Sequence, residues 1–165
     1  MATIHLETFI DAPIDRVFDL ARSIDLHKLS TKGTKEEAIA GRTTGLINLN
    51  ESVTWKAKHF GIYQKLTVVV TQFERPKMFV DKMINGAFSS MEHTHKFEVV
   101  GTQTKMIDIF LFNAPLGFLG RLAEMLFLKA YMTNFLVTKN KELKSVAESN
   151  KWQELLTTDE ILLQH

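Results

Sequence analysis

The chain has 165 residues, of which 45% are hydrophobic and 24% are charged, and its formal net charge is +1. This length favours a single domain, the near-neutral charge gives no basis for binding nucleic acid, and the absence of cysteine excludes disulfides, thiol nucleophiles and thiolate metal sites. No apolar run approaches the about 20 residues of a membrane-spanning helix, and the first residues do not resemble a signal peptide, so we expect a cytoplasmic protein that is not an integral membrane protein.

The first two thirds of the chain predict one strand, two short helices and then a run of strands. A strand at 3–10 is followed by Pro13, which suits the first turn of a short helix at 14–21, and a second short helix is expected at 23–29. A weak strand is expected next, at 35–40. Segments with alternating apolar and polar residues then predict strands at 53–59, 64–71, 78–84, 88–98 and 105–112.

The last third of the chain changes to helical spacing. Apolar residues with a helical period predict one long helix from 117 to 148. On this helix we expect Leu122, Leu126 and Met132 to be buried against the sheet, and Arg121 and Lys141 to be exposed.

The order of these elements predicts an α+β domain in which a curved antiparallel sheet wraps around the long C-terminal helix. The domain is expected to span 1–147, and 148–165 is expected to be a C-terminal tail with a short helical turn near 158–160. The space between a curved sheet and a helix is a natural ligand site.

The strand at 88–98 carries the most informative side chains. Alternate residues of a strand point to opposite faces, so Met91, His93, His95 and Phe97 share one face, while charged and hydroxyl residues occupy the other. Buried imidazoles need hydrogen-bond partners. A wall with both apolar and polar groups is typical of a cavity lining rather than of a plain core.

Five segments, taken in order, resemble the START/Bet v 1-like (SRPBCC) superfamily and its helix-grip fold. They are 12–18 (APIDRVF), 75–81 (RPKMFVD), 93–98 (HTHKFE), 101–108 (GTQTKMID) and 115–122 (PLGFLGRL). The chain looks most like the bacterial branch labelled polyketide cyclase/dehydrase-like or cell-division-inhibitor-like. The resemblance implies binding of a lipid, sterol, quinone, hormone or polyketide, and a minority of family members are enzymes.

The resemblance also sets the phase of the last strand, so that Asp108 joins Asp81 and the two histidines on the cavity wall. Three interpretations of this group remain open: a hydrogen-bonded network that only fixes the wall, ligand recognition, and general acid–base catalysis. The expected ligand-binding residues are His93, His95, Asp81, Asp108, His59, Trp55, Phe79, Met91, Phe110, Leu122 and Leu126.

No metal and no cofactor are expected. A site made of His59, His93, His95 and an aspartate would suit Zn or Fe, but no helical His-x-x-x-His and no cysteine spacing supports it. His59 is interpreted as a satisfied histidine near a strand end. Five lysines are interpreted as solvated groups rather than as a membrane-binding patch: Lys56, Lys58, Lys139, Lys141 and Lys144.

The leading hypothesis is binding or transport of a small hydrophobic ligand such as a lipid, a quinone or a polyketide-like molecule. The alternative is an enzyme of the cyclase/dehydrase or hydrolase type that uses a His/Asp pair in the same cavity. A third hypothesis, from the toxin-like branch of the superfamily, is a protein that binds a macromolecular partner. Because no nucleophile elbow, phosphate loop or dinucleotide fingerprint is present, binding is favoured over catalysis. The sequence does not decide between a monomer and a dimer.

Overall fold

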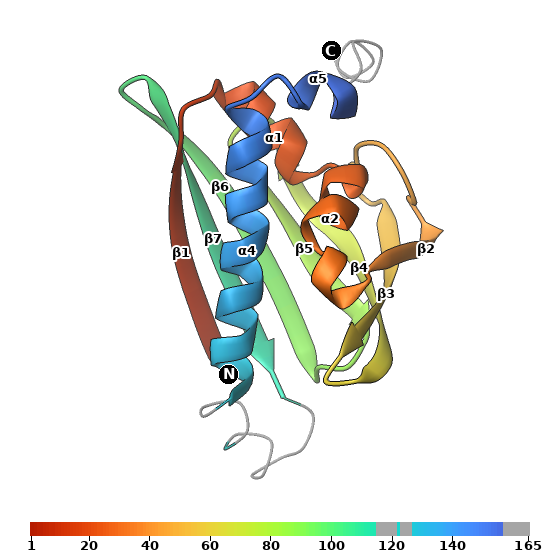
Figure 1. The fold of residues 1–165 in the computed structure, drawn as a ribbon. Helices are drawn as coiled ribbons and strands as arrows, with labels where there is room; N and C mark the ends of the chain where they lie inside the picture. The colour runs from red at the N-terminus through yellow and green to blue at the C-terminus, as the bar shows by residue number, and fades with distance from the viewer. Residues whose placement is uncertain (115–121, 123–126, 157–165) are drawn as a thin grey trace.

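The computed structural model describes residues 1–114, 122 and 127–156 of the chain. The strands are β1 (Ala2–Ile10), β2 (Glu37–Gly41), β3 (Ser52–His59), β4 (Ile62–Glu74), β5 (Met78–Asn85), β6 (Ser90–Val100) and β7 (Gln103–Asn113). They form one antiparallel sheet in the order β1-β7-β6-β5-β4-β3-β2 (Figure 1). The antiparallel sheet expected from the alternating residues is confirmed.

The helices α1 (Ile14–Ala21), α2 (Ile24–Ser30) and α4 (Lys129–Ala147) all lie on one face of this sheet (Figure 1). α1 begins directly after Pro13, and the hydroxyl of Ser23 caps α2 by accepting a hydrogen bond of 3.2 Å from the backbone N–H of Leu26. A 3-10 turn (Lys32–Thr34) connects α2 to β2. α4 packs on β1, α1 and α2, so the predicted α+β architecture is confirmed.

The C-terminal helix agrees with the prediction over the part that the structure describes. Met132 is buried and Lys141 is exposed, as expected. Leu122 is 49% exposed, so the expectation that it is buried is wrong. Helical spacing buries a residue only where the helix lies against the sheet, and the described stretch that packs on the core begins at Leu128. Arg121 and Leu126 lie outside the described residues.

A further short helix, α5 (Trp152–Leu155), follows α4 and packs against α1. The guanidinium of Arg16 lies 4.2 Å from the centre of the Trp152 ring, and Leu156 is buried. The helical turn predicted near 158–160 lies outside the described residues. None of the helices in the described part of the chain has the length and hydropathy needed to cross a bilayer.

The core is tightly packed beneath α1. The ring of Phe18 makes edge contacts with Phe73, Phe79 and Phe97, with centroid distances of 5.4, 5.5 and 5.2 Å. These aromatic contacts fix α1 on β4, β5 and β6, and they set one boundary of the space that remains between the sheet and α4.

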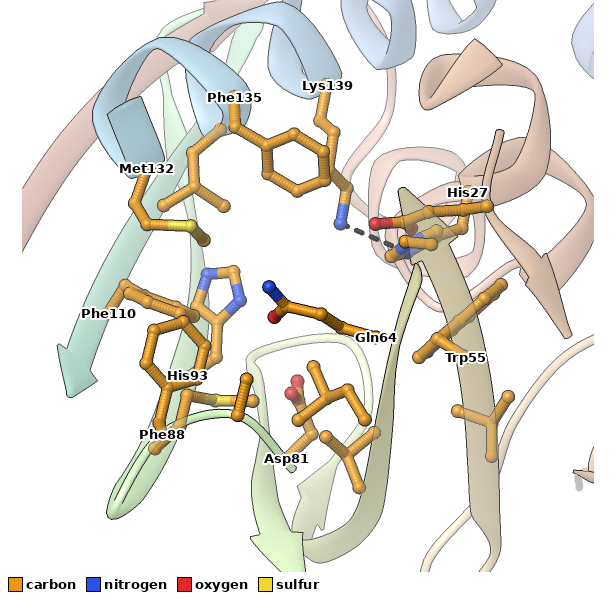
Figure 2. A pocket seen from close by; sticks show the side chains of 18 of the residues that line it. His27, Trp55, Gln64, Asp81, Phe88, His93, Phe110, Met132, Phe135 and Lys139 are labelled. Atoms are coloured by element: carbon orange, nitrogen blue, oxygen red, sulfur yellow. Dashed lines mark hydrogen bonds and ion pairs between the residues drawn. The ribbon is translucent and has the colours of Figure 1, made fainter. Parts of the chain in front are cut away.

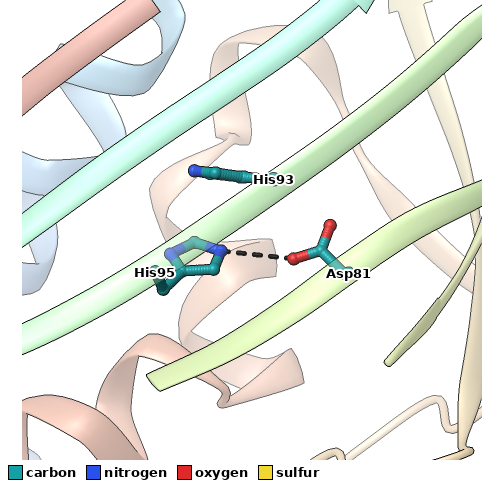
Figure 3. Close-up of side chains that lie close together, drawn as sticks. All are labelled: Asp81, His93 and His95. Atoms are coloured by element: carbon teal, nitrogen blue, oxygen red, sulfur yellow. Dashed lines mark hydrogen bonds and ion pairs between the residues drawn. The ribbon is translucent and has the colours of Figure 1, made fainter. Parts of the chain in front are cut away.

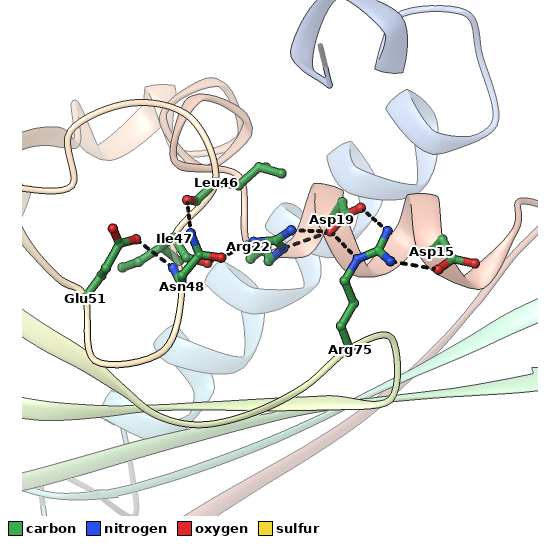
Figure 4. Close-up of polar contacts among 8 residues, drawn as sticks. All are labelled: Asp15, Asp19, Arg22, Leu46, Ile47, Asn48, Glu51 and Arg75. Carbon is green, nitrogen blue, oxygen red and sulfur yellow. Dashed lines mark hydrogen bonds and ion pairs between the residues drawn. The ribbon is translucent and has the colours of Figure 1, made fainter. Parts of the chain in front are cut away.

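A buried ion-pair network ties the end of α1 to two loops (Figure 4). Asp19 accepts hydrogen bonds from Nε and Nη2 of Arg22, at 2.8 and 2.6 Å, and from Nη2 of Arg75, at 2.7 Å. Nη1 of Arg22 also donates to Oδ1 of Asn48 at 2.8 Å. Arg75 reaches Asp15 at 3.3 Å. The network therefore holds the start of α2, and with it the side chains that α2 contributes to the site.

Candidate functional site

A cavity of about 450 Å³ lies between the sheet and the helices (Figure 2). Its walls are mainly apolar and include Trp55 of β3, Phe79 of β5, Phe110 of β7, and Met132 and Phe135 of α4. This volume is within the range of pockets that hold small organic molecules.

Most of the residues predicted to bind a ligand line this cavity: Trp55, His59, Phe79, Asp81, Met91, His93, His95 and Phe110. Asp108 lies just behind the wall, where it borders a smaller cavity of about 30 Å³. Leu122 is not among the residues that line the cavity, and Leu126 is outside the described residues. Contact with a ligand remains a prediction for all of them.

Strand register brings the histidines and aspartates together. Asp81 of β5 stands opposite His93 of β6, and His95 of β6 stands opposite Asp108 of β7. Nε2 of His93 and Nδ1 of His95 each lie 2.9 Å from Oδ1 of Asp108. Nε2 of His95 lies 3.2 Å from Oδ1 of Asp81 (Figure 3). The prediction that both imidazoles point inward, within reach of these carboxylates, is confirmed.

Asp108 is the fixed centre of this cluster. It is 1% exposed, and its second oxygen, Oδ2, accepts a hydrogen bond of 2.7 Å from the side-chain amide of Asn140 on α4. The amide of Asn140 also lies 3.3 Å from the hydroxyl of Thr8 on β1. Hydrogen bonds from the sheet and from α4 thus fix the carboxylate of Asp108, which can in turn orient both imidazoles.

The surroundings push the pKa values of the two histidines in opposite directions. Burial lowers the pKa of His95, but its hydrogen bonds to Asp108 and Asp81 outweigh burial and raise that pKa to about 9. Burial and the neighbouring His95 lower the pKa of His93. For Asp108, burial is outweighed by hydrogen bonds from both histidines, and its pKa lies well below the ordinary value. At neutral pH, His95 is therefore a cation between two carboxylates, and His93 is a neutral imidazole.

A second polar cluster, which the sequence analysis missed, lines another part of the cavity. Nε2 of His27 is hydrogen-bonded to the carboxylate of Glu36, and Nδ1 of His27 lies 3.0 Å from Nζ of Lys139 (Figure 2). The His27 ring is stacked on Trp55, with centroids 3.9 Å apart. Lys139 donates to Nδ1, so the Nε2–H of His27 donates to Glu36.

Lys139 was interpreted as a solvated lysine, and this is wrong because its side chain reaches from α4 into the cavity. Burial lowers the pKa of Lys139. Burial and the nearby Lys139 likewise lower the pKa of His27. No spacing in the sequence could have revealed this cluster, since its members come from α2, the segment before β2 and α4.

His59 and a group of aromatic rings form the edge of the cavity. Nδ1 of His59 lies 2.7 Å from the hydroxyl of Tyr131, which agrees with the interpretation of a satisfied histidine at a strand end. The ring of Phe60 lies 4.6 Å from that of Tyr131 and 5.3 Å from that of Phe127. Phe60 lines the cavity and is also half exposed, so this edge connects the cavity with the surface.

The comparisons with known proteins identify the fold. No family model matches the chain, and no curated protein sequence matches it. Among solved structures, TTHA0849 from Thermus thermophilus aligns with a TM-score of 0.72 at 20% identity, covering 87% of this chain and 95% of that chain. A START superfamily protein from Mycobacterium smegmatis aligns with a TM-score of 0.67 at 12% identity, covering 88% and 97%. The ginseng major latex-like protein 151 from Panax ginseng aligns with a TM-score of 0.66 at 12% identity, covering 90% and 98%.

The chain therefore has the START/Bet v 1-like fold. The helix-grip arrangement predicted from the sequence is confirmed. At these identities the likeness shows the fold alone, and the polyketide cyclase-like or cell-division-inhibitor-like branch remains a prediction.

Proposed function

We propose that the protein binds a small hydrophobic ligand reversibly in the cavity, and that it carries or presents this ligand. The observation that supports the proposal is a cavity of about 450 Å³ whose walls are mostly apolar. Each Å² of apolar surface that leaves water contributes roughly 25 cal/mol before the cost of ordering the ligand. A ligand of modest size can therefore bind through burial alone.

Polar side chains are the minority of the lining, and they would set the orientation of the ligand; besides the cluster of His27, Glu36 and Lys139 they include Gln64 of β4. His93, His95 and Asp81 lie on the sheet, while Lys139 reaches in from α4. A molecule with an apolar body and one or two oxygen groups fits this distribution. Lipids, quinones and polyketide-like compounds share this chemistry, and the walls do not select among them.

The alternative proposal is an enzyme of the cyclase/dehydrase or hydrolase type. One observation favours it: His93 lines the cavity, its pKa is lowered, and it is paired with Asp108. A neutral imidazole oriented by a carboxylate can accept a proton from a bound molecule. Binding remains the leading proposal, because no nucleophile motif accompanies this pair in the sequence.

The binding proposal is tested by filling the cavity. Ala57 is buried on β3 and lines the cavity, whereas Lys58, the next residue, is exposed. We expect Ala57→Phe to weaken binding of the probe 1-anilinonaphthalene-8-sulfonate, of palmitate and of decylubiquinone by about tenfold or more, which is about 1.4 kcal/mol. Lys58→Phe introduces the same ring on the other face of the strand and should bind as the wild type does. The proposal fails if none of the three binds to the wild type, or if Ala57→Phe binds all of them unchanged.

The two proposals are separated by His93→Gln, with binding and product formation measured on the same candidate compound. A role in binding predicts a loss of about tenfold in affinity and no product from either protein. A role as acid or base predicts turnover by the wild type and a loss of about a hundredfold or more in the variant, with affinity largely kept. That second result would replace binding by catalysis as the function.

A further inference from the structure

The side chains of Asp81, His93 and His95 converge on one point of the cavity wall. One ring nitrogen of each histidine and one carboxylate oxygen of Asp81 all lie within 4.8 Å of one another (Figure 3). Zinc holds nitrogen and oxygen ligands at about 2.0–2.2 Å, which places neighbouring donors of a tetrahedral ion about 3.4 Å apart. Nε2 of His95 and Oδ1 of Asp81 are already 3.2 Å apart. Small side-chain rotations would close the remaining distance.

The other nitrogens of both imidazoles are held by Asp108. Nε2 of His93 and Nδ1 of His95 lie 2.9 Å from the same oxygen, Oδ1. The nitrogens that remain for an ion are Nδ1 of His93, and Nε2 of His95 once it gives up the proton that it shares with Asp81. Figure 2 shows a ring nitrogen of His93 pointing into the cavity. Histidines that bind a metal almost always donate their second N–H to a carboxylate, a carbonyl or water. Asn140 fixes Asp108 by its amide, at 2.7 Å, so the outer carboxylate is itself held in place.

The charge of the cluster also suits a cation. Asp81 and Asp108 bring two carboxylates to a largely apolar wall. Buried charges are stable only when they are paired or bind a metal. In the metal-free protein these carboxylates are paired with the imidazolium of His95. A divalent ion would displace the proton from Nε2 of His95 and take over this pairing.

We propose that Asp81, His93 and His95 bind a divalent transition-metal ion, with Asp108 as the outer carboxylate that orients the two imidazoles. Two imidazoles and one carboxylate suit Zn²⁺ or Fe²⁺, whereas Mg²⁺ and Ca²⁺ prefer sites made of oxygen. Three protein ligands leave at least one coordination position directed at the cavity, where water or an oxygen of a bound molecule would complete the site. This ion site goes beyond the binding of an apolar ligand, and it can be tested without one.

The test is metal titration of the full chain, freed of any affinity tag and treated with a chelator. Zn²⁺ binding is followed by calorimetry, and Co²⁺ binding by its visible absorption, which reports nitrogen and oxygen ligands at low coordination number. We expect one ion per chain with micromolar affinity or tighter. His93→Gln and Asp81→Asn should each weaken binding by more than the about 10- to 100-fold that loss of an outer partner costs.

Two further variants complete the test. Asp108→Asn keeps all three ligands, so it should weaken Zn²⁺ binding by about 10- to 100-fold without abolishing it. His5→Gln removes an exposed histidine of β1 and should leave the affinity unchanged. Circular dichroism of each variant shows whether it is folded, and because Asp81→Asn and His93→Gln alter different strands, either one alone tests the site. The proposal is overturned if the wild type does not bind Zn²⁺ or Co²⁺ in a saturable one-to-one manner, or if His93→Gln and Asp81→Asn bind as the wild type does.

Discussion

Nδ1 of His95 lies 2.9 Å from Oδ1 of Asp108, and both side chains are buried in the wall of an apolar cavity. A second carboxylate, that of Asp81 on β5, lies 3.2 Å from the other ring nitrogen of His95. On its own strand His95 has His93 as a neighbour, and from α4 the buried Lys139 interacts electrostatically with Glu36, Asp81 and Asp108. An imidazolium held between two carboxylates ties β5, β6 and β7 together.

This pairing makes stability depend on pH in a defined direction. The pKa of His95 is raised from 6.5 to about 9 by its hydrogen bonds to Asp108 and Asp81, against the effect of burial. A group whose pKa is raised by folding stabilises the fold fully below its unfolded pKa and loses that contribution as the pH rises through its folded pKa. We therefore expect the stability difference between the wild type and His95→Gln to be largest below pH 6.5 and to shrink by pH 9.

The measurement is urea unfolding of both proteins over this pH range, with a chelator present. His5→Gln, which removes an exposed histidine, is the control and should follow the wild type at every pH. A difference that stays constant, or grows as the pH rises, would show that His95 is not a cation in the folded protein.

The ion-pair network at the end of α1 predicts a large loss on removing one charge. The side chains of Asp19 and Arg22 are 2% and 0% exposed, so Asp19→Asn leaves the charge of Arg22 buried without its carboxylate. Removing one partner of such a buried pair costs about 3–5 kcal/mol. Asp15→Asn is the matched control, because Asp15 is mostly exposed and its pair with Arg75 should contribute at most about 1 kcal/mol. Equal effects of the two variants in chemical unfolding would show that the buried network carries no special stability.

The sequence predicted the strand that carries the two histidines because its polar face is unmistakable. Glu92, Thr94 and Lys96 alternate with His93 and His95, so the inward direction of the imidazoles follows from the period of a strand. Asp81 could be proposed as a partner from its place on a strand, whereas Asp108 could be proposed only because the family resemblance set the phase of the last strand, whose own alternation is ambiguous. The same His-x-His spacing places two imidazoles on one face of a strand, and the sequence analysis set a metal site at these histidines aside because neither a helical His-x-x-x-His nor a cysteine spacing supports it.

The second polar cluster could not be predicted for a physical reason. His27, Glu36 and Lys139 each come from a polar-looking segment, and only the packing of α2 and α4 over the sheet brings them together. Lys139 lies on a helix with two exposed lysines, Lys129 and Lys141, so the composition of the helix gives no sign that Lys139 points inward. Leu122 shows the opposite error, because helical spacing alone does not tell which apolar residues are buried against the sheet.

Core substitutions should distinguish packed residues from residues that border the cavity. Phe18 is fully buried among other aromatic rings, so Phe18→Ala should cost about 3–5 kcal/mol of unfolding free energy. Leu136 is also buried, but it lines the cavity, so Leu136→Ala should fall near the lower end of the about 2–5 kcal/mol range for such changes. The Leu136→Ala variant should also bind bulkier probes, because the substitution enlarges the cavity that Leu136 lines. Thermal and urea unfolding give the two values, and a larger loss for Leu136→Ala than for Phe18→Ala would mean that the cavity is filled by repacking in solution.

Lys139 should determine whether the cavity accepts an anionic ligand. Its Nζ donates one hydrogen bond to Nδ1 of His27, and an ammonium has two further N–H groups to offer to a bound molecule. A hydrogen bond to a charged group contributes about 1.5–3 kcal/mol. We therefore expect Lys139→Met to weaken the binding of palmitate by about tenfold or more, while hexadecanol, which has the same chain and no charge, binds as well as before or better. Fluorescence displacement of a bound probe measures the affinity for both ligands.

Lys141→Met is the control, because it changes an exposed lysine of the same helix and should alter neither affinity. An equal loss for palmitate and hexadecanol would assign Lys139 a structural role beside His27 and Glu36, and unchanged binding of palmitate would show that this ammonium does not contact the ligand.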